Sequence, residues 1–431
     1  MFPTSTTKLR KNLIFTLGCT TLAALASPAG GDELTRAEVL EAPALVEAVL
    51  ARNPDMEAMQ AAWQASQEVE RGSGAWDDPM LGASLAPLSL GGEARTGYAV
   101  QLEQRFPFPG KRGLEKDAAR EGARMAEYGR ETVRLQLARL TVRAFADYAA
   151  AHEALVLKHR QEDLARETVT VAEGLYTVGR VPQQEALQAE LERVRLEHDR
   201  IVLETDWHTA RARLNALLHR EQDALLPPPA PLPERVALPE PNTDEQSHPR
   251  LQTLEAGIAA ADAEEALARR EYWPDFTIMA GYDNMWEMSE HRWMAGASIN
   301  VPIQRTPRRA AVDEARYRSA EQRARLRGEQ AQLKEAVTIA LHRAREAHHD
   351  LVLLEERTLP VARAQVEAAR SAYEAGQVTL TALLDAQRSL WAFEEREIKA
   401  RAELSAYLAD YDYARGLLPR LDPNTHHGEA P

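Results

Sequence analysis

Ligands for soft metal ions gather in one short stretch of this sequence. Met285, Met288 and His291 lie within seven residues of one another, and thioether and imidazole groups suit Cu(I) or Ag(I). Two more methionines and two tryptophans stand in or beside the stretch: Met279, Met294, Trp286 and Trp293. Tryptophan in such a setting is more often an anchor at a membrane interface. The stretch is therefore either a transient metal contact or a lipid-facing loop.

No catalytic motif accompanies these residues. The chain has no His-Glu-x-x-His and no Gly-x-Ser-x-Gly, and Gly110-Lys111 lacks the other residues of a phosphate loop. Three further histidines lie on a helical stretch and are interpreted as surface or packing residues: His342, His348 and His349. The sequence therefore predicts no enzyme activity and no cofactor.

Charge and the N-terminus narrow the class of protein. The formal net charge is −14, whereas nucleic-acid binders present basic patches, so we expect no nucleic acid as a partner. Residues 1–26 combine a basic start, an apolar run and small residues at a cleavage site, which predicts a signal peptide. The only cysteine, Cys19, lies inside it. Cleavage after Ala26 would remove this cysteine, while Thr16-Leu17-Gly18-Cys19 could alternatively be a lipidation site.

Motifs recur along the chain at an offset of 195 to 197 residues. Asn53-Pro54 matches His248-Pro249, and Tyr176-x-x-Gly179 matches Tyr373-x-x-Gly376. A period this long exceeds the 20–50 residues of solenoid repeats and indicates a duplicated half-molecule. We predict two structural repeats, 43–225 and 247–420, with a Pro-rich linker at 226–246 and a disordered tail at 421–431.

Each repeat is predicted to contain a helix, two strands, a long helix, a tip and a final helix. The predicted helices cover residues 54–73, 114–176 and 182–220, then 249–271, 309–375 and 380–417. Apolar positions in the long helices follow the spacing of a coiled coil. The two shorter helices of a repeat together match the long one in length, so we expect them to stack end to end along it. Pro360 should kink the second long helix because it lacks a backbone donor.

The strands imply a closed assembly. Residues alternate between apolar and more polar from Tyr98 to Glu103 and again from Phe276 to Tyr282, as in half-buried strands. Four strands cannot hide their own edges, but three chains supply twelve. The predicted fold class is mostly α with a small β part, internally duplicated. It consists of a long coiled-coil-like α-helical barrel and a transmembrane β-barrel, with four strands per chain and twelve in a homotrimer.

The sequence resembles the TolC-like outer-membrane efflux protein family over nearly all of the chain that follows the predicted signal peptide. Several motifs carry this resemblance: Asn53-Pro54, Phe106-Pro107-Phe108-Pro109-Gly110-Lys111-Arg112, Trp273-Pro274-Asp275-Phe276, Tyr373 to Thr379, and Leu383-Leu384-Asp385-Ala386-Gln387. The stretch from Phe106 to Arg112 is similar to the heavy-metal branch of the family, of the CzcC and CusC type.

The resemblance implies an exit duct in the outer membrane of a Gram-negative bacterium, extending into the periplasm. It would belong to a tripartite resistance-nodulation-division efflux system that exports heavy-metal cations. The alternative uses of this architecture are drug export and type I protein secretion. The implied partners are two further copies of the chain, a periplasmic adaptor, an inner-membrane pump and outer-membrane lipid.

The resemblance also assigns candidate sites. Asp385 stands where relatives close the pore with acidic residues, Glu185 matches it in the first repeat, and the neighbouring acidic position is Ala382 here. These acids could instead be first-turn residues favoured by the helix dipole. Both tips need glycine for a tight reversal, and the resemblance adds adaptor docking there. The tip residues are Val178, Gly179 and Arg180 in the first repeat and Ala375, Gly376 and Gln377 in the second.

Overall fold

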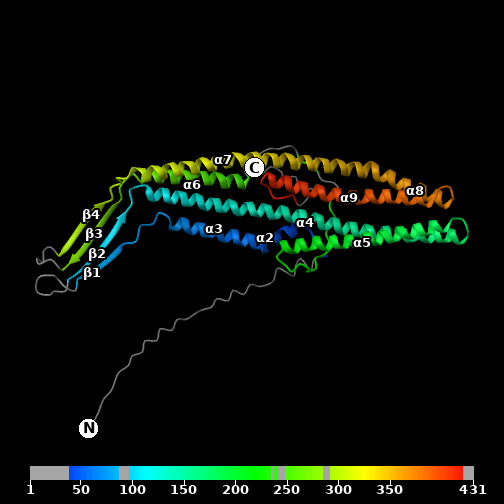
Figure 1. The fold of residues 1–431 in the computed structure, drawn as a ribbon, viewed down its shortest axis with the longest axis horizontal. Coiled ribbons are helices and arrows are strands. Elements are labelled where there is room, and N and C mark those ends of the chain that lie inside the picture. The colour runs from blue at the N-terminus through cyan, green and yellow to red at the C-terminus, as the bar shows by residue number, and fades with distance from the viewer. Residues whose placement is uncertain (1–37, 87–96, 234–236, 240–247, 285–291, 421–431) are drawn as a thin grey trace, which may run out of the picture.

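The computed structural model describes residues 38–86, 97–233, 237–239, 248–284 and 292–420. The molecule is elongated, with a β-sheet at one end and two helical tips at the other (Figure 1). The predicted signal peptide, the soft-ligand residues Met285, Met288 and His291, and the predicted tail lie outside the described residues.

Apart from α2 in the first half and the interruption at η2 in the second, the described parts of both halves contain the same series of elements. The first half contains α2 (Ala42–Arg52), α3 (Pro54–Gly72), β1 (Met80–Ala86), β2 (Gly97–Phe106), α4 (Lys111–Thr177) and α5 (Gln183–Leu217). The second contains α6 (Pro249–Arg270), β3 (Phe276–Asp283), β4 (Trp293–Ile299), α7 (Arg305–Leu353), the π-helical turn η2 (Leu354–Thr358), α8 (Leu359–Glu374) and α9 (Leu380–Ala414). The sequence did not predict α2 as a separate helix; it has Pro43 in its first turn, a favoured position.

Equivalent capping residues join the two shorter helices of each repeat. Asn53 caps α3 by accepting a backbone hydrogen bond at 2.9 Å, and its Nδ2 donates to the Leu217 carbonyl at the end of α5, at 3.0 Å. His248 does the same for α6. Its Nδ1 accepts a backbone N–H at 3.1 Å, and its Nε2 donates to the Tyr413 carbonyl at the end of α9, at 3.1 Å. Each cap therefore holds the start of one short helix against the end of the second short helix of the same repeat: α3 against α5, and α6 against α9.

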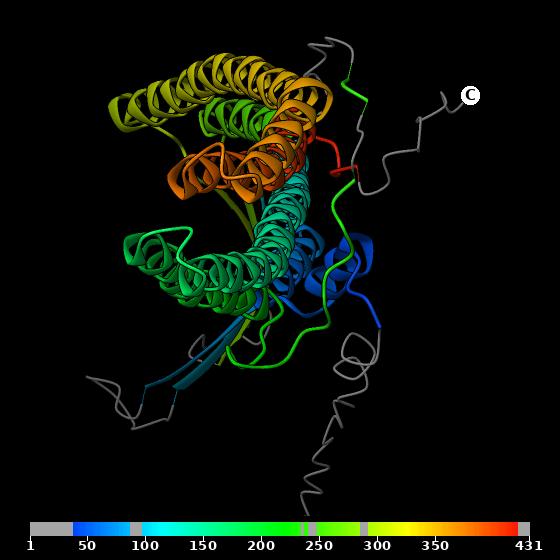
Figure 2. The same cartoon turned by 90° about the vertical axis from the view of Figure 1, so that its right-hand side faces the viewer.

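The helices form a curved wall. The long helix α4 packs against α3 and α5 along its length, and α7 packs against α6 and α9 in the same way. Helix α4 also contacts α6 and α9, which joins the two repeats. Seen along the helices, these elements lie on an arc that is open on one side (Figure 2). The predicted end-to-end stacking of short helices along each long one is confirmed.

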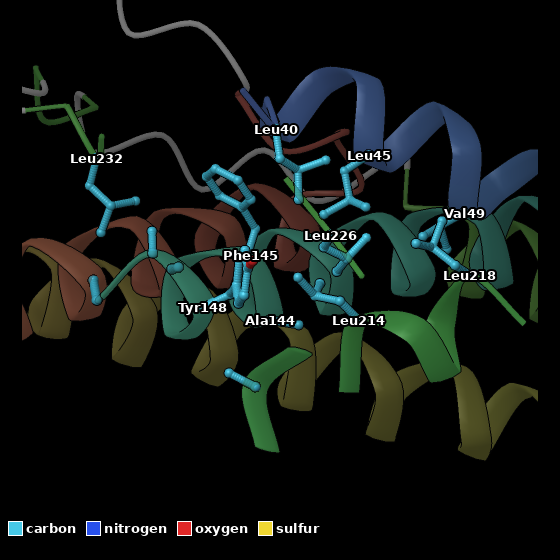
Figure 3. Packing of buried hydrophobic residues seen from close by; sticks show 14 of the residues in the cluster. Leu40, Leu45, Val49, Ala144, Phe145, Tyr148, Leu214, Leu218, Leu226 and Leu232 are labelled. Atoms are coloured by element: carbon cyan, nitrogen blue, oxygen red, sulfur yellow. The ribbon is translucent and has the colours of Figure 1, made fainter. Parts of the chain in front are cut away.

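The largest apolar cluster lies midway along the wall, where α2 and the Pro-rich segment cross α4 and α5 (Figure 3). Tyr148 of α4 is fully buried there, and its hydroxyl donates to the Pro227 carbonyl at 3.1 Å. Leu40 forms a parallel bridge with Pro229 beside it. Burial of each large side chain contributes about 1.5–3 kcal/mol, so this cluster holds the connecting segment against the helices.

The second long helix is interrupted where the sequence predicts a kink. Pro360 lies in the first turn of α8, and the π-helical turn η2 immediately precedes it. Proline supplies no N–H and crowds the carbonyl four residues earlier, and a wider turn accommodates both effects. Thr358 Oγ1 donates to the Leu353 carbonyl at 3.2 Å inside the turn. The matching residue of α4, Asp163, lies in unbroken helix.

The four strands form one antiparallel sheet in the order β1-β2-β3-β4. Leu102 in β2 pairs with Leu81 in β1 and with Ala280 in β3, so one face of the sheet carries apolar residues from every strand. Leu81 is 74% exposed and Trp293 is 77% exposed on this face. Among the described residues, none of the helices is both long and apolar enough to cross a bilayer.

A buried ion cluster fixes the joint between the sheet and the helices. Lys111 Nζ lies 2.8 Å from Asp275 Oδ1, and both side chains are only 3% exposed. Arg105 binds the other carboxylate oxygen at 2.6 Å, and the Phe108 N–H donates to Asp275 at 2.9 Å. Burial acts to raise the pKa of Asp275, but these bonds outweigh it and lower the pKa to about 2. The joint therefore gives the Phe106-to-Arg112 motif a structural role, because its Lys111 ammonium and its Phe108 N–H both bind an acid of the other repeat.

Candidate gate at the helical tips

Both tips are built by the same backbone motif. Gly179 ends the α4 tip with φ +73°, and Gly376 ends the α8 tip with φ +71°. In the first tip the Gly179 N–H donates to Tyr176 and the Arg180 N–H to Leu175, each at 2.9 Å. The second tip repeats this pair of bonds at 2.9 and 2.8 Å. This is the Schellman arrangement, which needs a left-handed residue, so the predicted role of glycine at both tips is confirmed.

Helices α4 and α5 form the first helical hairpin, and α8 and α9 form the second. An apolar cluster holds the two hairpins together beside the tips. It joins Ala172 and Ala189 of the first hairpin to Tyr373, Leu383 and others of the second. Tyr373 is 3% exposed and Leu383 is 4% exposed. Two alanines let the helices approach closely, and the larger residues fill the space between them.

Tyr373 also makes a polar contact with the first hairpin. Its hydroxyl donates to Glu185 Oε2 at 3.3 Å. Burial and the nearby Glu185 carboxylate raise the pKa of Tyr373 to about 12. Tyr373 therefore stays a neutral hydrogen-bond donor at any physiological pH.

Arg388 of α9 makes a bidentate ion pair with the first hairpin. Its Nη2 and Nε bind the two carboxylate oxygens of Glu192 on α5, at 2.5 and 3.1 Å. The Glu192 side chain is only 4% exposed, and a bidentate guanidinium–carboxylate pair is among the stronger charge-assisted contacts. Arg388 Nη1 also lies 3.3 Å from Asp385 Oδ1.

Further ion pairs join the hairpins away from the tips. Arg370 of α8 binds Glu167 of α4 at 2.8 Å. Lys158 of α4, whose side chain is 6% exposed, binds Glu395 of α9 at 2.7 Å. Both pairs connect one repeat to the other, so separating the tips requires breaking contacts along more than one helical turn.

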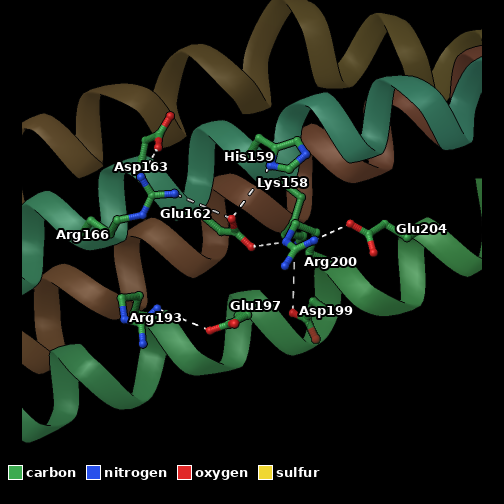
Figure 4. Close-up of polar contacts among 10 residues, drawn as sticks. All are labelled: Lys158, His159, Glu162, Asp163, Arg166, Arg193, Glu197, Asp199, Arg200 and Glu204. Atoms are coloured by element: carbon green, nitrogen blue, oxygen red, sulfur yellow. Dashed lines mark hydrogen bonds and ion pairs between the residues drawn. The ribbon is translucent and has the colours of Figure 1, made fainter.

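Other charges stay within the first hairpin. Arg200 of α5 binds Glu162 of α4 at 2.9 Å and also contacts Glu204 on its own helix (Figure 4). Within the described residues, Arg193 binds acids of its own helix, Glu190 and Glu197. The first hairpin therefore has its own polar bonds between α4 and α5, separate from those that bind it to α9.

The family of outer membrane efflux proteins matches residues 45–219 and 241–420, which is most of the chain. The chain belongs to this family. Among its relatives, the nickel-cobalt-cadmium resistance protein NccC of Alcaligenes xylosoxydans xylosoxydans is 25% identical over 295 residues, which are 67% of each chain.

Solved structures share the fold of this efflux protein. CusC, whose crystal structures concern folding and transmembrane channel formation, has a TM-score of 0.78 at 18% identity, covering 89% of this chain and 94% of that one. The outer membrane protein VceC from Vibrio cholerae has a TM-score of 0.74 at 17% identity, covering 87% and 96%. The predicted fold class, mostly α with a small four-stranded antiparallel sheet, and the outer-membrane location in a Gram-negative bacterium are confirmed.

The two predicted gate acids of the efflux protein have different surroundings. Asp385 lies on α9, 64% exposed, beside Arg388, while Glu185 lies on α5 beneath the Tyr373 hydroxyl. Sequence reasoning missed the Arg388–Glu192 pair. The only signal for it was opposite charges at nearly equivalent positions of the two repeats.

No cluster of histidine, cysteine and acidic residues able to hold a metal is present among the described parts of the efflux protein. Met279 is described, and its sulfur lies 3.9 Å from Gln101 Nε2, which occupies it in a polar contact on the sheet. The soft-metal interpretation of the neighbouring stretch stays a prediction, because Met285, Met288 and His291 lie outside the described residues.

Proposed function

We propose that this efflux protein is the exit duct of a tripartite system that exports heavy-metal cations, and that it performs no chemical reaction itself. One observation carries the proposal: the sheet lies at one end of the molecule, and both glycine-ended tips lie at the other (Figure 1). A sheet with an exposed apolar face suits a bilayer. The long helices place the tips far from this sheet, where they could contact proteins on the far side of the periplasm.

A trimer follows from the sheet. Strands β1 and β4 lie at its two edges, and open edges in a bilayer leave backbone groups without hydrogen bonds, at a cost of several kcal/mol each. Three copies supply twelve strands, which can close. The open arc of helices in Figure 2 would then become one third of a tunnel wall.

The tips are the proposed gate and docking site. Contacts of Tyr373 and Arg388 with the first hairpin hold the tip helices together, and engagement of an adaptor and pump would separate them. Three copies of exposed Asp385 around a narrow pore would attract cations, with Glu185 as a second candidate. Because Ala382 replaces the neighbouring acid, one ring of carboxylates is proposed rather than two.

The metal cargo is supported by the Phe106-to-Arg112 motif and by the similarity to a nickel-cobalt-cadmium resistance protein. Drug export and type I protein secretion are the alternative uses of this architecture. The pump and adaptor select the substrate, so the cargo is tested in cells.

The test is growth of a deletion strain, with and without the restored gene, on Zn²⁺, Cd²⁺, Co²⁺, Ni²⁺, Cu and Ag salts and on hydrophobic drugs. We expect sensitivity to metal salts that the restored gene reverses. A gene carrying Asp385→Ala should restore growth less well than one carrying Asp163→Ala, which alters an exposed acid of α4. Sensitivity to drugs alone would overturn the metal assignment.

A further inference from the structure

The two edges of the sheet differ in charge where they meet the helices. Residues 75–79, just before β1, contain Asp77 and Asp78, both exposed. Residues 300–309, just after β4, contain Arg305 and Arg309, which are also exposed. These segments lie at opposite edges of one sheet, so in a single chain the acids and the arginines cannot meet.

A concave surface lies beside β4 at this point. A cavity of about 740 Å³ lies here. It is lined by the aromatic residues Tyr272 and Trp273, by Arg305 and Arg309, and by Pro302 and Thr306. Apolar side chains continue the surface, since Val301 is 64% exposed and Ile303 is 82% exposed. Exposed apolar surface next to open strand edges indicates a contact with another chain.

The internal duplication shows which segment fits there. Inside the chain, the end of β2 packs on the start of β3: Phe108 stacks on Trp273 with ring centres 5.1 Å apart, and Arg270 donates to the Pro109 carbonyl at 2.6 Å. At the repeat offset of 195 residues, Ile303 is the position equivalent to Phe108, and Asp78 is the position equivalent to Trp273. The equivalent joint therefore places the end of β4 on residues 75–79, which only a second copy of the chain can supply.

Both the joint inside the chain and the equivalent joint between subunits place a small residue opposite an arginine, but the two residues exchange sides. Inside the chain Gly110 faces Arg270, and a Cβ on that glycine would lie 2.5 Å from the guanidinium. The equivalent positions hold Arg305 and Ala75, so the large residue is on the other side of the joint. A small residue opposite an arginine at both joints is what shared geometry requires.

Resting on the trimer proposed above, we propose that residues 75–79 of one subunit occupy the cavity beside β4 of the next, with Asp77 and Asp78 facing Arg305 and Arg309. Gln104 in β2 pairs with Ile278 in β3. The equivalent pair at the same offset is Ile299 in β4 of one subunit and Ala83 in β1 of the next. This keeps the apolar faces of β4 and β1 on the same side of the sheet, as their pairings with β3 and β2 require.

Cysteine cross-linking tests this joint, because Cys19 is the only cysteine in the chain. Purified efflux protein carrying Asp78→Cys and Ile303→Cys should form disulfide-linked dimers and trimers on oxidation. Neither single variant should do so, and neither should Ile303→Cys combined with Asp55→Cys, a control at the far end of α3. Light scattering in detergent establishes the trimer beforehand.

Charge reversal supplies an independent arm. Arg305→Glu or Asp78→Arg alone should lower the temperature at which the trimer dissociates, and the two combined should recover most of the loss. A trimer that shows neither cross-linking nor this recovery overturns the proposed joint while leaving the trimer intact. A protein that is monomeric by light scattering overturns the trimer itself, and the joint with it.

Discussion

His248 makes the stability of this protein depend on pH. The side chain is fully buried, and both ring nitrogens are used: Nδ1 accepts a backbone N–H and Nε2 donates to the Tyr413 carbonyl. Protonation of Nδ1 would break the cap of α6. Burial is the main reason that the pKa of His248 falls from 6.5 to about 4; the hydrogen bond to the Tyr413 carbonyl opposes this fall, and the charge of Arg250 adds the smallest contribution, which lowers the pKa further.

The size of the effect follows from these two values. Between pH 6.5 and 4 the unfolded chain binds a proton that the folded chain does not, so stability falls as the pH falls. One pKa unit corresponds to about 1.4 kcal/mol. His248 should therefore cost about 2 kcal/mol at pH 5 and about 3 kcal/mol below pH 4, relative to pH 7.5.

The duplication provides the matched variant. Asn53 makes both bonds in the first repeat without titrating, so His248→Asn should keep the cap and remove this part of the pH dependence. His248→Ala should also remove the titration, but it should lose about 1 kcal/mol or more at every pH because the cap is gone.

Unfolding in detergent at a series of pH values, followed by circular dichroism, gives the differences between variants. The other titrating groups cancel in this comparison because all variants share them. If wild type and His248→Asn lose the same stability between pH 7.5 and 4.5, the role assigned to His248 is wrong. An NMR titration of the His248 ring near pH 6.5 would contradict it equally.

Further predictions concern the tips and the joint. Gly376→Ala should destabilise the protein by about 1–2 kcal/mol, because φ is +71° at this position. Gly174→Ala lies inside α4 with open space around it and should instead stabilise the protein by about 0.5–1 kcal/mol. Thermal unfolding of both variants measures the two changes, and changes of equal sign would contradict the argument. Asp275→Asn should cost about 3 kcal/mol, because it leaves the buried Lys111 without its carboxylate. Chemical unfolding measures this cost. If Asp275→Asn loses less stability than Asp313→Asn, which alters an exposed ion pair, the ion cluster between the sheet and the helices does not have the importance assigned to it.

Local signals in the sequence predicted most of the elements. Residues 54–73 were predicted helical and α3 covers Pro54–Gly72; residues 182–220 were predicted and α5 covers Gln183–Leu217. Proline, glycine and the apolar period act within a few residues of where they stand, so one sequence suffices to read them. The π-helical turn before Pro360 was not predicted, because proline marks an interruption without specifying its form.

Contacts between distant residues were less accessible. The sequence singled out both the Phe106-to-Arg112 motif and the Trp273-to-Phe276 motif, but not the contact between them, because Asp275 lies 164 positions from Lys111. Glu192 and Arg388 look like ordinary surface charges on two helices until the helices are placed side by side. Asp385 and Glu185 came from family resemblance, and their pore role stays a prediction, because the pore exists only when several chains assemble.

Planar-bilayer recording of the purified protein tests the central claim, a duct held shut at its tips. Wild type should conduct weakly. Arg388→Ala should conduct more, because it breaks the link from α9 to Glu192, while Arg193→Ala, which removes an arginine paired only within α5, should behave as wild type. Equal conductance in all three would contradict the assignment of the gate, and a protein that never conducts in any form would contradict the duct.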